Sequence, residues 1–195
     1  MDKELIKESV KNIIIALGDD PDREGLKETP KRVAKMFEEV FEGMQYSNAE
    51  IAQMFKKGFK VNTKDLVVES DIPVFSYCEH HLALMYDMKV SIAYLPNGTV
   101  LGLSKLARIA DMCAKRLQLQ ERLGADIAEC IQLATGSDKV YVRSVMDHGC
   151  VSARGAKSSG VTDVTYITQE LRKDSEARKE IECKVQELHL SAKYR

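Results

Sequence analysis

The sequence lacks a long apolar run, a signal-like beginning and an excess of charge of either sign. No apolar stretch approaches the ~20 residues that cross a bilayer, and Met1-Asp2-Lys3-Glu4 has neither the basic nor the apolar region of a signal peptide. The net charge of −1 argues against broad nucleic-acid binding, so any recognition of phosphate must rely on locally placed cations. We therefore expect a cytoplasmic protein with neither a membrane nor a nucleic acid as its partner.

Cysteine is present in an odd number, and neither repeats nor low-complexity linkers interrupt the chain. Five cysteines without an export signal are expected to be reduced thiols or metal ligands rather than a disulfide framework. The 195 residues are 44% hydrophobic and 30% charged, ordinary values for a globular protein with a core. This length suits one domain, or a small N-terminal helical part joined to a larger one.

The first part of the chain is predicted to be helical. Apolar residues recur at helical spacing between Leu5 and Leu17, and the stretch Gly18-Asp19-Asp20-Pro21 ends that helix. A second helix is predicted to begin with Thr29 as its N-cap and Pro30 in the first helical position, where proline loses no needed hydrogen bond.

From about Leu66 the pattern changes to strands. Apolar and polar residues alternate over Met88–Tyr94, which predicts a half-buried strand. Pro96-Asn97-Gly98 predicts a hairpin turn with a return strand at Val100–Leu103, because asparagine and glycine tolerate positive φ. The other strands are predicted at Leu66–Val68, Ile72–Phe75, Lys139–Met146 and Val161–Thr168.

Three more helices complete the predicted architecture. They are expected at about Ser104–Leu117, Ala125–Leu133 and Leu171–Leu188. Ser104 is the expected N-cap of the first of these. The fold class is therefore α+β: a helical pair within residues 1–60, followed over residues 61–195 by an antiparallel sheet with helices on one side.

Histidine is scarce, and three of the four histidines lie in two short segments that also contain cysteine. These segments are Cys78-Glu79-His80-His81 and His148-Gly149-Cys150. Thiolate and imidazole are ligands that Zn²⁺ prefers, and three protein ligands plus a water form the open geometry of a catalytic zinc. Cys78 and His81 are spaced so that one turn can present both side chains to an ion, and Cys150 would complete the set.

The remaining members of the two segments suit supporting roles. His80 and His148 would lie beside the metal as proton carriers, and Glu79 would orient a ligand. On an extended segment, His148 and Cys150 would face the same side of the chain. Two alternatives stay open: ordinary burial of single cysteines and histidines in a core, and a disulfide between Cys78 and Cys150.

Two further clusters fit a phosphorylated, nitrogen-rich ligand. Ser104, Lys105 and Arg108 place a hydroxyl and two cations near a helix start, where backbone N–H groups already favour anions. Gln120 and Glu121 offer an amide and a carboxylate near a helix end, and such a pair can read the edge of a purine base.

Three more cations are less specific. Arg154 follows Cys150 by four residues and adds a positive charge near the expected metal. Arg32 and Lys35 lie one turn apart on the second helix, where an ordinary solvated surface is the preferred interpretation from that segment alone.

Taken together, these segments resemble the GTP cyclohydrolase I family. The matching segments are Glu28–Lys35, Cys78–His81, Gly102–Arg108, Gln118–Leu123 and His148–Gly155. They occur in the family's order at compatible spacings, which is far more specific than any one motif. The chain departs from the family pattern at Gly124 and Gly149, where the family usually has a larger residue.

The resemblance implies a fold, an assembly and a reaction. The fold would be a tunnelling-fold (T-fold) catalytic domain over residues 61–195, with an antiparallel four-stranded sheet. The assembly would be a toroidal homodecamer with active sites between subunits. The reaction would be hydrolysis of GTP to 7,8-dihydroneopterin triphosphate and formate, in which a zinc-activated water attacks C8 of the purine. This is the first step of tetrahydrofolate and pterin biosynthesis.

The resemblance also implies roles for single residues. The Zn²⁺ ligands would be Cys78, His81 and Cys150. The acid–base residues would be His148 and His80, and Ser104 would serve the later ribose rearrangement. The guanine edge would be held by Glu121 with Gln120. The triphosphate would be held by Arg32, Lys35, Lys105, Arg108 and Arg154.

Two other functions stay open at this point. One is a sister enzyme that hydrolyses a related purine nucleotide or stops at the ring-opened formamide. The other is a non-catalytic member that binds a nucleotide or a partner. His80 and His148 argue against the second, because a binding module needs no acid–base residues. Nitrile reductases of the same fold class use a cysteine nucleophile and a nicotinamide cofactor, whereas the two cysteine–histidine segments here favour metal-assisted hydrolysis.

Overall fold

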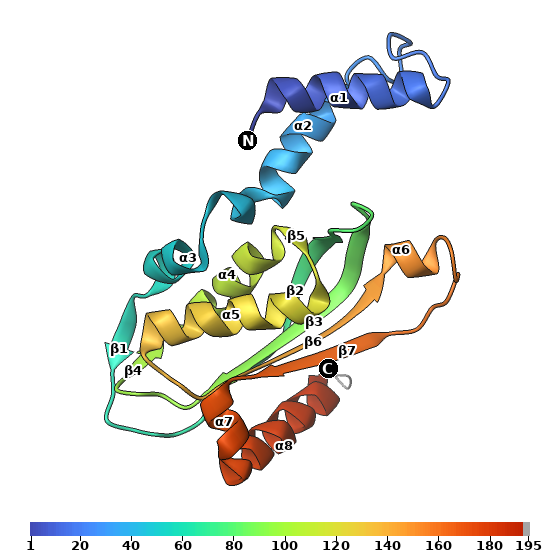
Figure 1. Cartoon of the computed structure of the whole chain (residues 1–195). Coiled ribbons are helices and arrows are strands. Elements are labelled where there is room, and N and C mark those ends of the chain that lie inside the picture. Colours follow the sequence, from blue (N-terminus) through green and yellow to red (C-terminus); the bar gives the residue numbers. More distant parts are fainter. Residues whose placement is uncertain (193–195) are drawn as a thin grey trace.

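The centre of the molecule is a five-stranded sheet, which a computed structural model describes together with the rest of residues 1–192 (Figure 1). The strand order is β5-β2-β3-β6-β7. The strands are β2 Val67–Cys78, β3 Leu84–Tyr94, β5 Leu117–Gln118, β6 Val140–His148 and β7 Thr162–Ile167. The four long strands pair antiparallel, and β5 adds a short parallel pairing at the end of β2. The predicted α+β class is confirmed.

Two helices cover one face of this sheet. They are α4 (Leu103–Ala114) and α5 (Gln120–Thr135). Leu106 and Ile109 of α4 are fully buried together with Ile92 of β3. A strand turns every second residue to the same face, so the alternation in β3 supplies the surface on which the helical stripes pack.

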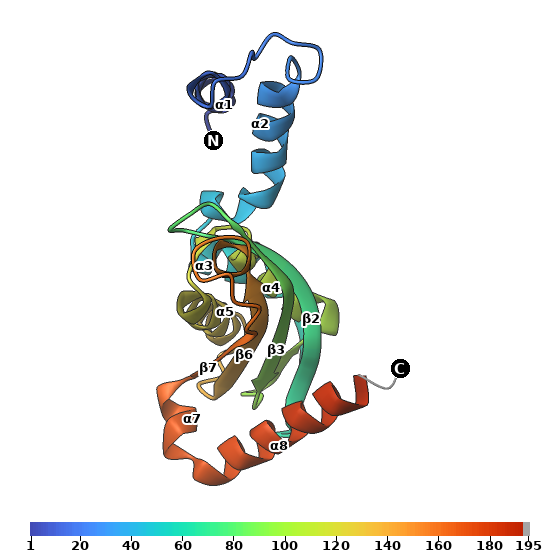
Figure 2. The same ribbon diagram turned by 90° about the vertical axis from the view of Figure 1, so that its right-hand side faces the viewer.

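The C-terminal helices lie against the opposite face. The predicted single helix over Leu171–Leu188 is two helices, α7 (Gln169–Lys173) and α8 (Ser175–Ala192). Their core with the sheet consists of Ala93, Tyr141, Ile167, Leu171, Ile181 and Val185. Figure 2 shows α8 running across the end of the curved sheet, away from α5. The C-terminal helices therefore add a second, partial cover to the layer formed by α4 and α5.

The first two helices form a hairpin that projects from this body (Figures 1 and 2). They are α1 (Lys3–Ala16) and α2 (Thr29–Val40). The N-cap position of α2 is Glu28, and no side chain caps this helix, so the prediction for Thr29 is off by one residue. The hairpin joins the body through Phe41, whose ring centroid is 5.2 Å from that of Tyr77 on β2. Among the helices of residues 1–192, none combines the length and the apolar character that a bilayer crossing requires.

The segment between α2 and the sheet contains η1 (Glu42–Gln45), α3 (Asn48–Phe55) and β1 (Gly58–Lys60). A capping box fixes the start of α3, since Ser47 accepts from the Glu50 backbone while the Glu50 carboxylate accepts from the Ser47 backbone. This helix packs on α4 and α5.

The strand that follows the predicted turn at Asn97-Gly98 pairs with a different strand from the one expected. The turn is present, with Gly98 at φ 76°, and the return strand is β4 (Thr99–Leu101). However, β4 pairs with β1 and not with β3. The physical reason is that β3 already pairs with β2 on one edge and with β6 on the other, so no edge of β3 is free for β4.

Several element boundaries also differ from the predictions. Ser104 does not cap α4, because Gly102 occupies the N-cap position without a side-chain hydrogen bond. Leu117 lies in β5, where it pairs with β2, and not in the helix. The helix predicted from Ala125 begins five residues earlier, at Gln120. The two predicted strands before Cys78 are one strand, β2, with an irregularity in its pairing at Asp71, whose φ is 57°.

Candidate metal centre and substrate cavity

The turn between β2 and β3 presents Cys78 and His81 together. The Cys78 backbone N–H donates to the Ala83 carbonyl at 2.9 Å, and the Leu82 N–H donates to the Cys78 carbonyl at 2.9 Å. Leu82 has a φ of 51°, a left-handed conformation that a leucine rarely adopts. Within this tight turn Cys78 Sγ lies 4.0 Å from His81 Nδ1. The predicted spacing of these two residues is therefore realised as a turn that holds both side chains.

Cys150 reaches this turn through a close backbone approach. Cys150 lies in a short helix, α6 (Gly149–Ser152), and not on the extended segment predicted for it. A Cβ atom on Gly149 would lie 2.7 Å from the Leu84 carbonyl oxygen, so a side chain would push α6 away from the start of β3. This close approach favours glycine at position 149. The ligand atoms of Cys78, His81 and Cys150 all lie within 4.8 Å of one another.

The donor set suits a thiophilic metal ion. Both Cys78 and Cys150 are free thiols in the structure. Burial raises the pKa of the Cys150 thiol, the neighbouring Cys78 raises it further, and the positive charge of Arg154 acts in the opposite direction. The Cys150 thiol therefore resists deprotonation in the absence of a cation, whereas a bound metal ion stabilises a thiolate. Two sulfurs and an imidazole nitrogen form a set that Zn²⁺ accepts, with a fourth position left for water.

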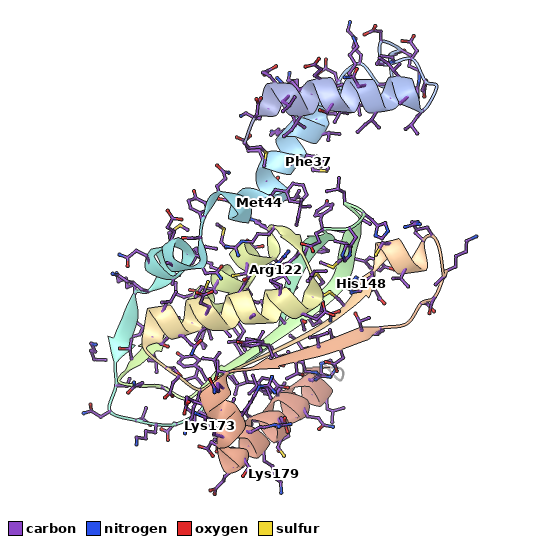
Figure 3. All side chains as sticks on the ribbon, in the orientation of Figure 1. Phe37, Met44, Arg122, His148, Lys173 and Lys179 are labelled. Atoms are coloured by element: carbon purple, nitrogen blue, oxygen red, sulfur yellow. The ribbon has the colours of Figure 1, made fainter. Side chains whose placement is uncertain are left out.

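His148 is held by Gln120, at the point where β6 ends beside the first turn of α5 (Figure 3). The Gln120 amide donates from Nε2 to the Ser144 carbonyl at 2.9 Å and to the Thr162 carbonyl at 3.3 Å. This fixes Oε1 toward His148, whose Nε2 lies 3.1 Å away and must donate. A neutral His148 therefore carries its proton on Nε2 and has the lone pair on Nδ1.

This arrangement changes the interpretation of Gln120. Its side chain is buried, and both ends of its amide are engaged within the chain. It supports His148 through its side chain, so a contact of that amide with a guanine edge would have to displace these partners. His80 differs from His148 in being exposed, with Nδ1 3.8 Å from Cys78 Sγ.

These residues line one cavity of about 600 Å³, a size typical of sites for small molecules. The predicted site residues in its wall are Cys78, His80, His81, Gln120, Glu121, His148 and Cys150. The sequence did not single out Thr162 and Val164 of β7, which form part of the same wall. Residues 162 and 164 alternate along a predicted strand, so they were expected to share a face of the sheet. Threonine and valine side chains, however, do not by themselves indicate a binding site.

The predicted phosphate-binding cations do not line the cavity wall. Within residues 1–192, the cavity wall includes none of the five, which are Arg32, Lys35, Lys105, Arg108 and Arg154. Ser104 is also outside the wall. The end of α4 leads into β5 beside Cys78, whereas Ser104 and Lys105 lie at its beginning, about 15 Å away along the helix axis. Arg32 and Lys35 are exposed on the projecting helix α2. One copy of the chain thus brings together the metal ligands and His148, with Arg154 near Cys150, but not the other four cations.

Glu79 has a partner that the sequence did not suggest. Its carboxylate accepts from Arg122 Nη2 at 2.6 Å, and within residues 1–192 it forms no hydrogen bond or ion pair with a histidine ring. The predicted orientation of a metal ligand by Glu79 is therefore not seen. No spacing rule connects positions 79 and 122, so only the fold could reveal this pair.

Comparison with known proteins identifies close relatives. The profile of the family "GTP cyclohydrolase I" matches residues 6–186. Over 171 residues the chain is 57% identical to a GTP cyclohydrolase 1 of Clostridium botulinum (strain Loch Maree / Type A3), which covers 85% of this chain and 87% of the relative. A GTP cyclohydrolase 1 of Clostridium beijerinckii is 50% identical over 187 residues, covering 92% of this chain and 95% of the relative. Among solved structures, an apo archaeosine synthase QueF-Like aligns with a TM-score of 0.46 and 20% identity, over 55% of this chain and 96% of that one.

Proposed function

The chain belongs to the GTP cyclohydrolase I family, and from this premise we propose that it hydrolyses GTP to 7,8-dihydroneopterin triphosphate and formate. The observation that carries the proposal is the convergence of Cys78, His81 and Cys150, with ligand atoms within 4.8 Å of one another, in one cavity with His148 and Glu121. Two thiols, an imidazole and an acid–base histidine suit hydrolysis at an electron-poor ring carbon.

We propose Zn²⁺ as the metal, held by Cys78, His81 and Cys150. When bound, the ion supplies Lewis-acid chemistry that lowers the pKa of a coordinated water to near neutrality and makes it a nucleophile for C8 of the purine. The chain's own contribution is to fix the ligands: the β2–β3 turn orients Cys78 and His81, and the approach of Gly149 to β3 delivers Cys150.

Proton transfer is assigned to His148, assisted by His80. Opening the imidazole ring requires protons to move onto and off ring nitrogens, and a neutral His148 with its lone pair on Nδ1 can accept one. Gln120 keeps this tautomer in place, since its Oε1 accepts the Nε2 proton. We therefore propose Gln120 as support for His148, besides the contact with guanine that the resemblance implies. Glu121, exposed in the cavity wall, would accept from the guanine N–H donors.

The triphosphate is proposed to bind between subunits. Arg32, Lys35, Lys105, Arg108 and Ser104 would approach the cavity from other copies of the chain, because they lie outside its wall in the copy that supplies the metal ligands. Arg154 lies in the same copy as Cys150, close enough for its charge to act on that thiol. This distribution supports the homodecamer with shared active sites that the resemblance implies. Ser104 would then serve the ribose rearrangement at a site completed by a neighbour.

The proposed place of the reaction is the cytoplasm, where the ligand thiols stay reduced. The product would enter tetrahydrofolate and pterin biosynthesis.

The test is turnover of GTP by reduced protein with and without metal. We expect Zn²⁺-loaded protein to release formate and to form a pterin that fluoresces after oxidation, and chelation to abolish both. Cys150→Ser should behave as the chelated protein does. GTP binding without formate would favour a non-catalytic family member, and formate without pterin would favour a sister hydrolase that stops after ring opening. Unchanged turnover after complete metal removal would contradict the zinc assignment.

A further inference from the structure

The guanidinium group of Arg122 contacts three acceptors around the metal turn. Its Nη2 donates to Glu79 Oε2 at 2.6 Å and to the Leu117 carbonyl at 2.7 Å, and its Nε donates to Gln118 Oε1 at 2.8 Å. Arg122 lies in the first turn of α5, directly after Glu121 (Figure 3). One side chain thus joins α5, β5 and the turn that carries two of the metal ligands.

The acceptors are themselves fixed. Glu79 follows Cys78 directly, and its backbone N–H donates to the Gln118 carbonyl at 3.1 Å. Gln118 is fully buried, and its Nε2 donates to the Cys113 carbonyl at 3.1 Å and to Asp126 at 2.9 Å, which leaves Oε1 turned toward Arg122. The guanidinium therefore connects groups that other hydrogen bonds already hold in place, and Glu79 is not a mobile surface residue.

We propose that Arg122 is a positioning residue for the metal centre: it fixes the Cys78–His81 turn against the first turn of α5, where Gln120 and Glu121 face the cavity. This inference rests on the proposed function. Arginine suits the position because its planar group offers several donors in a fixed arrangement, whereas a lysine ammonium cannot reach three acceptors with the same geometry.

The competing interpretation is an ordinary surface ion pair. The side chains of Arg122 and Glu79 are 44% and 30% exposed, and pairs of this exposure contribute little to folding stability. The two interpretations differ in where the effect of a substitution appears. A positioning residue affects the affinity of the site for metal, whereas a surface pair affects neither metal binding nor turnover.

The chain offers a matched control. Arg178 and Glu182 on α8 form an ion pair at 2.8 Å with exposures of 45% and 40%, and neither residue lines the cavity. Arg178→Ala therefore removes a comparable pair outside the site.

The experiment compares the full-length parent with Arg122→Ala, Arg122→Lys, Glu79→Gln and Arg178→Ala. Zn²⁺ affinity is measured on reduced protein by competition with a chelator, and GTP turnover is measured on the same samples at saturating Zn²⁺. We expect Arg122→Ala to bind Zn²⁺ roughly 10–100-fold more weakly, the usual effect of removing a partner of a metal-ligating segment. Arg122→Lys should recover part of this loss, and Arg178→Ala should match the parent. The double variant Arg122→Ala/Glu79→Gln should lose little more than Arg122→Ala alone.

Three outcomes would overturn the inference. The first is Arg122→Ala with the parent's Zn²⁺ affinity, even if its thermal stability falls, since that is a purely structural effect. The second is an equal loss in Arg178→Ala. The third is a parent that binds no Zn²⁺, and only this result overturns the proposed function as well.

Discussion

His148 and Gln120 show how a single contact between two side chains assigns a chemical state. The two carbonyl groups that accept from the Gln120 amide leave its oxygen to face His148, and this oxygen can only accept. The tautomer of His148 follows from this hydrogen bond and not from the histidine itself. Gln120, for which the resemblance implies a contact with guanine, therefore also holds His148 in one tautomer.

Removal of the His148 imidazole should separate binding from chemistry. We expect His148→Ala to keep Zn²⁺ and GTP binding and to lose roughly 10²–10⁴-fold in turnover, the usual contribution of general acid–base catalysis. Single-turnover assays with equilibrium binding of GTP to the same protein check this. Loss of metal together with activity would instead show that His148 is part of the metal site.

Glu121 allows a test of base recognition. A charged hydrogen bond to the guanine edge contributes roughly 1.5–3 kcal/mol, or about ten- to a hundredfold in affinity. Glu121→Gln should therefore lose most of the preference for GTP over ATP in competition binding. Glu129 is also exposed on α5, but it lies about two turns further along the helix and outside the cavity wall. Glu129→Gln is therefore the control that should keep the preference. Equal binding of GTP and ATP by the parent would contradict the assignment.

At the scale of elements, Gly124 and Tyr166 set the distance between α5 and β7. A Cβ atom on Gly124 of α5 would lie 2.8 Å from Cβ of Tyr166 on β7. The helix and the strand therefore approach more closely than a side chain at position 124 allows, and the tyrosine fills the space. Since Glu121 lies one turn before Gly124, this contact also fixes the position of Glu121 in the cavity wall.

A threonine at position 124 should therefore overpack the α5–β7 contact. We expect Gly124→Thr to lower the stability of the protein by about 1–3 kcal/mol, despite the better helix propensity of threonine over glycine. Tyr166→Gly in the same chain should restore part of this loss, because it removes the Cβ atom that a side chain at position 124 would meet. Thermal unfolding of the two single variants and the double variant measures the interaction free energy between positions 124 and 166. Additive effects would show that the two positions do not compete for space.

At the scale of the whole molecule, most of the predicted phosphate-binding cations are separate from the metal ligands. Metal ligands, His148 and Glu121 converge in one cavity, while Lys105 in the first turn of α4 and Arg108 in the middle of that helix lie outside the cavity wall. The projecting α1–α2 hairpin carries further cations away from the sheet (Figure 1). We therefore expect the proposed site to be complete only beside another copy of the chain.

Co-expression of two inactive variants tests the shared site. One variant is Cys150→Ser, and the other combines Lys105→Ala with Arg108→Ala. If each site takes its metal ligands from one copy and these cations from another, about one quarter of the sites in a random mixture are intact, and activity returns to about that level. The control pairs Cys150→Ser with His148→Ala, whose defects lie on the same side of the cavity, and should restore nothing. Mixed oligomers without activity in the first pair would show that each site is built within one chain.

Much of the architecture could be predicted from the sequence because the signals are local. The helical repeat of α1, the alternation in β3 and the β6–β7 pair were all expected from residue patterns, as was the turn at Gly98. The partner of β4 was predicted wrongly, because strand pairing depends on which edges remain free after β2, β3 and β6 have assembled. The start of α5 was missed because Gln120 and Glu121 were taken as a binding motif near a helix end.

The sequence by itself determined the chemistry on offer: which residues can bind Zn²⁺, move protons and attract phosphate, since these properties belong to residue types and their spacing. Tertiary structure decided which of them meet. The approach of Gly149 to Leu84 brings Cys150 to the turn that carries Cys78, Gln120 selects the tautomer of His148, and Arg122 joins that turn to α5. Each of these contacts spans at least 28 residues of sequence, and such distances are closed only by packing of the sheet and its helices.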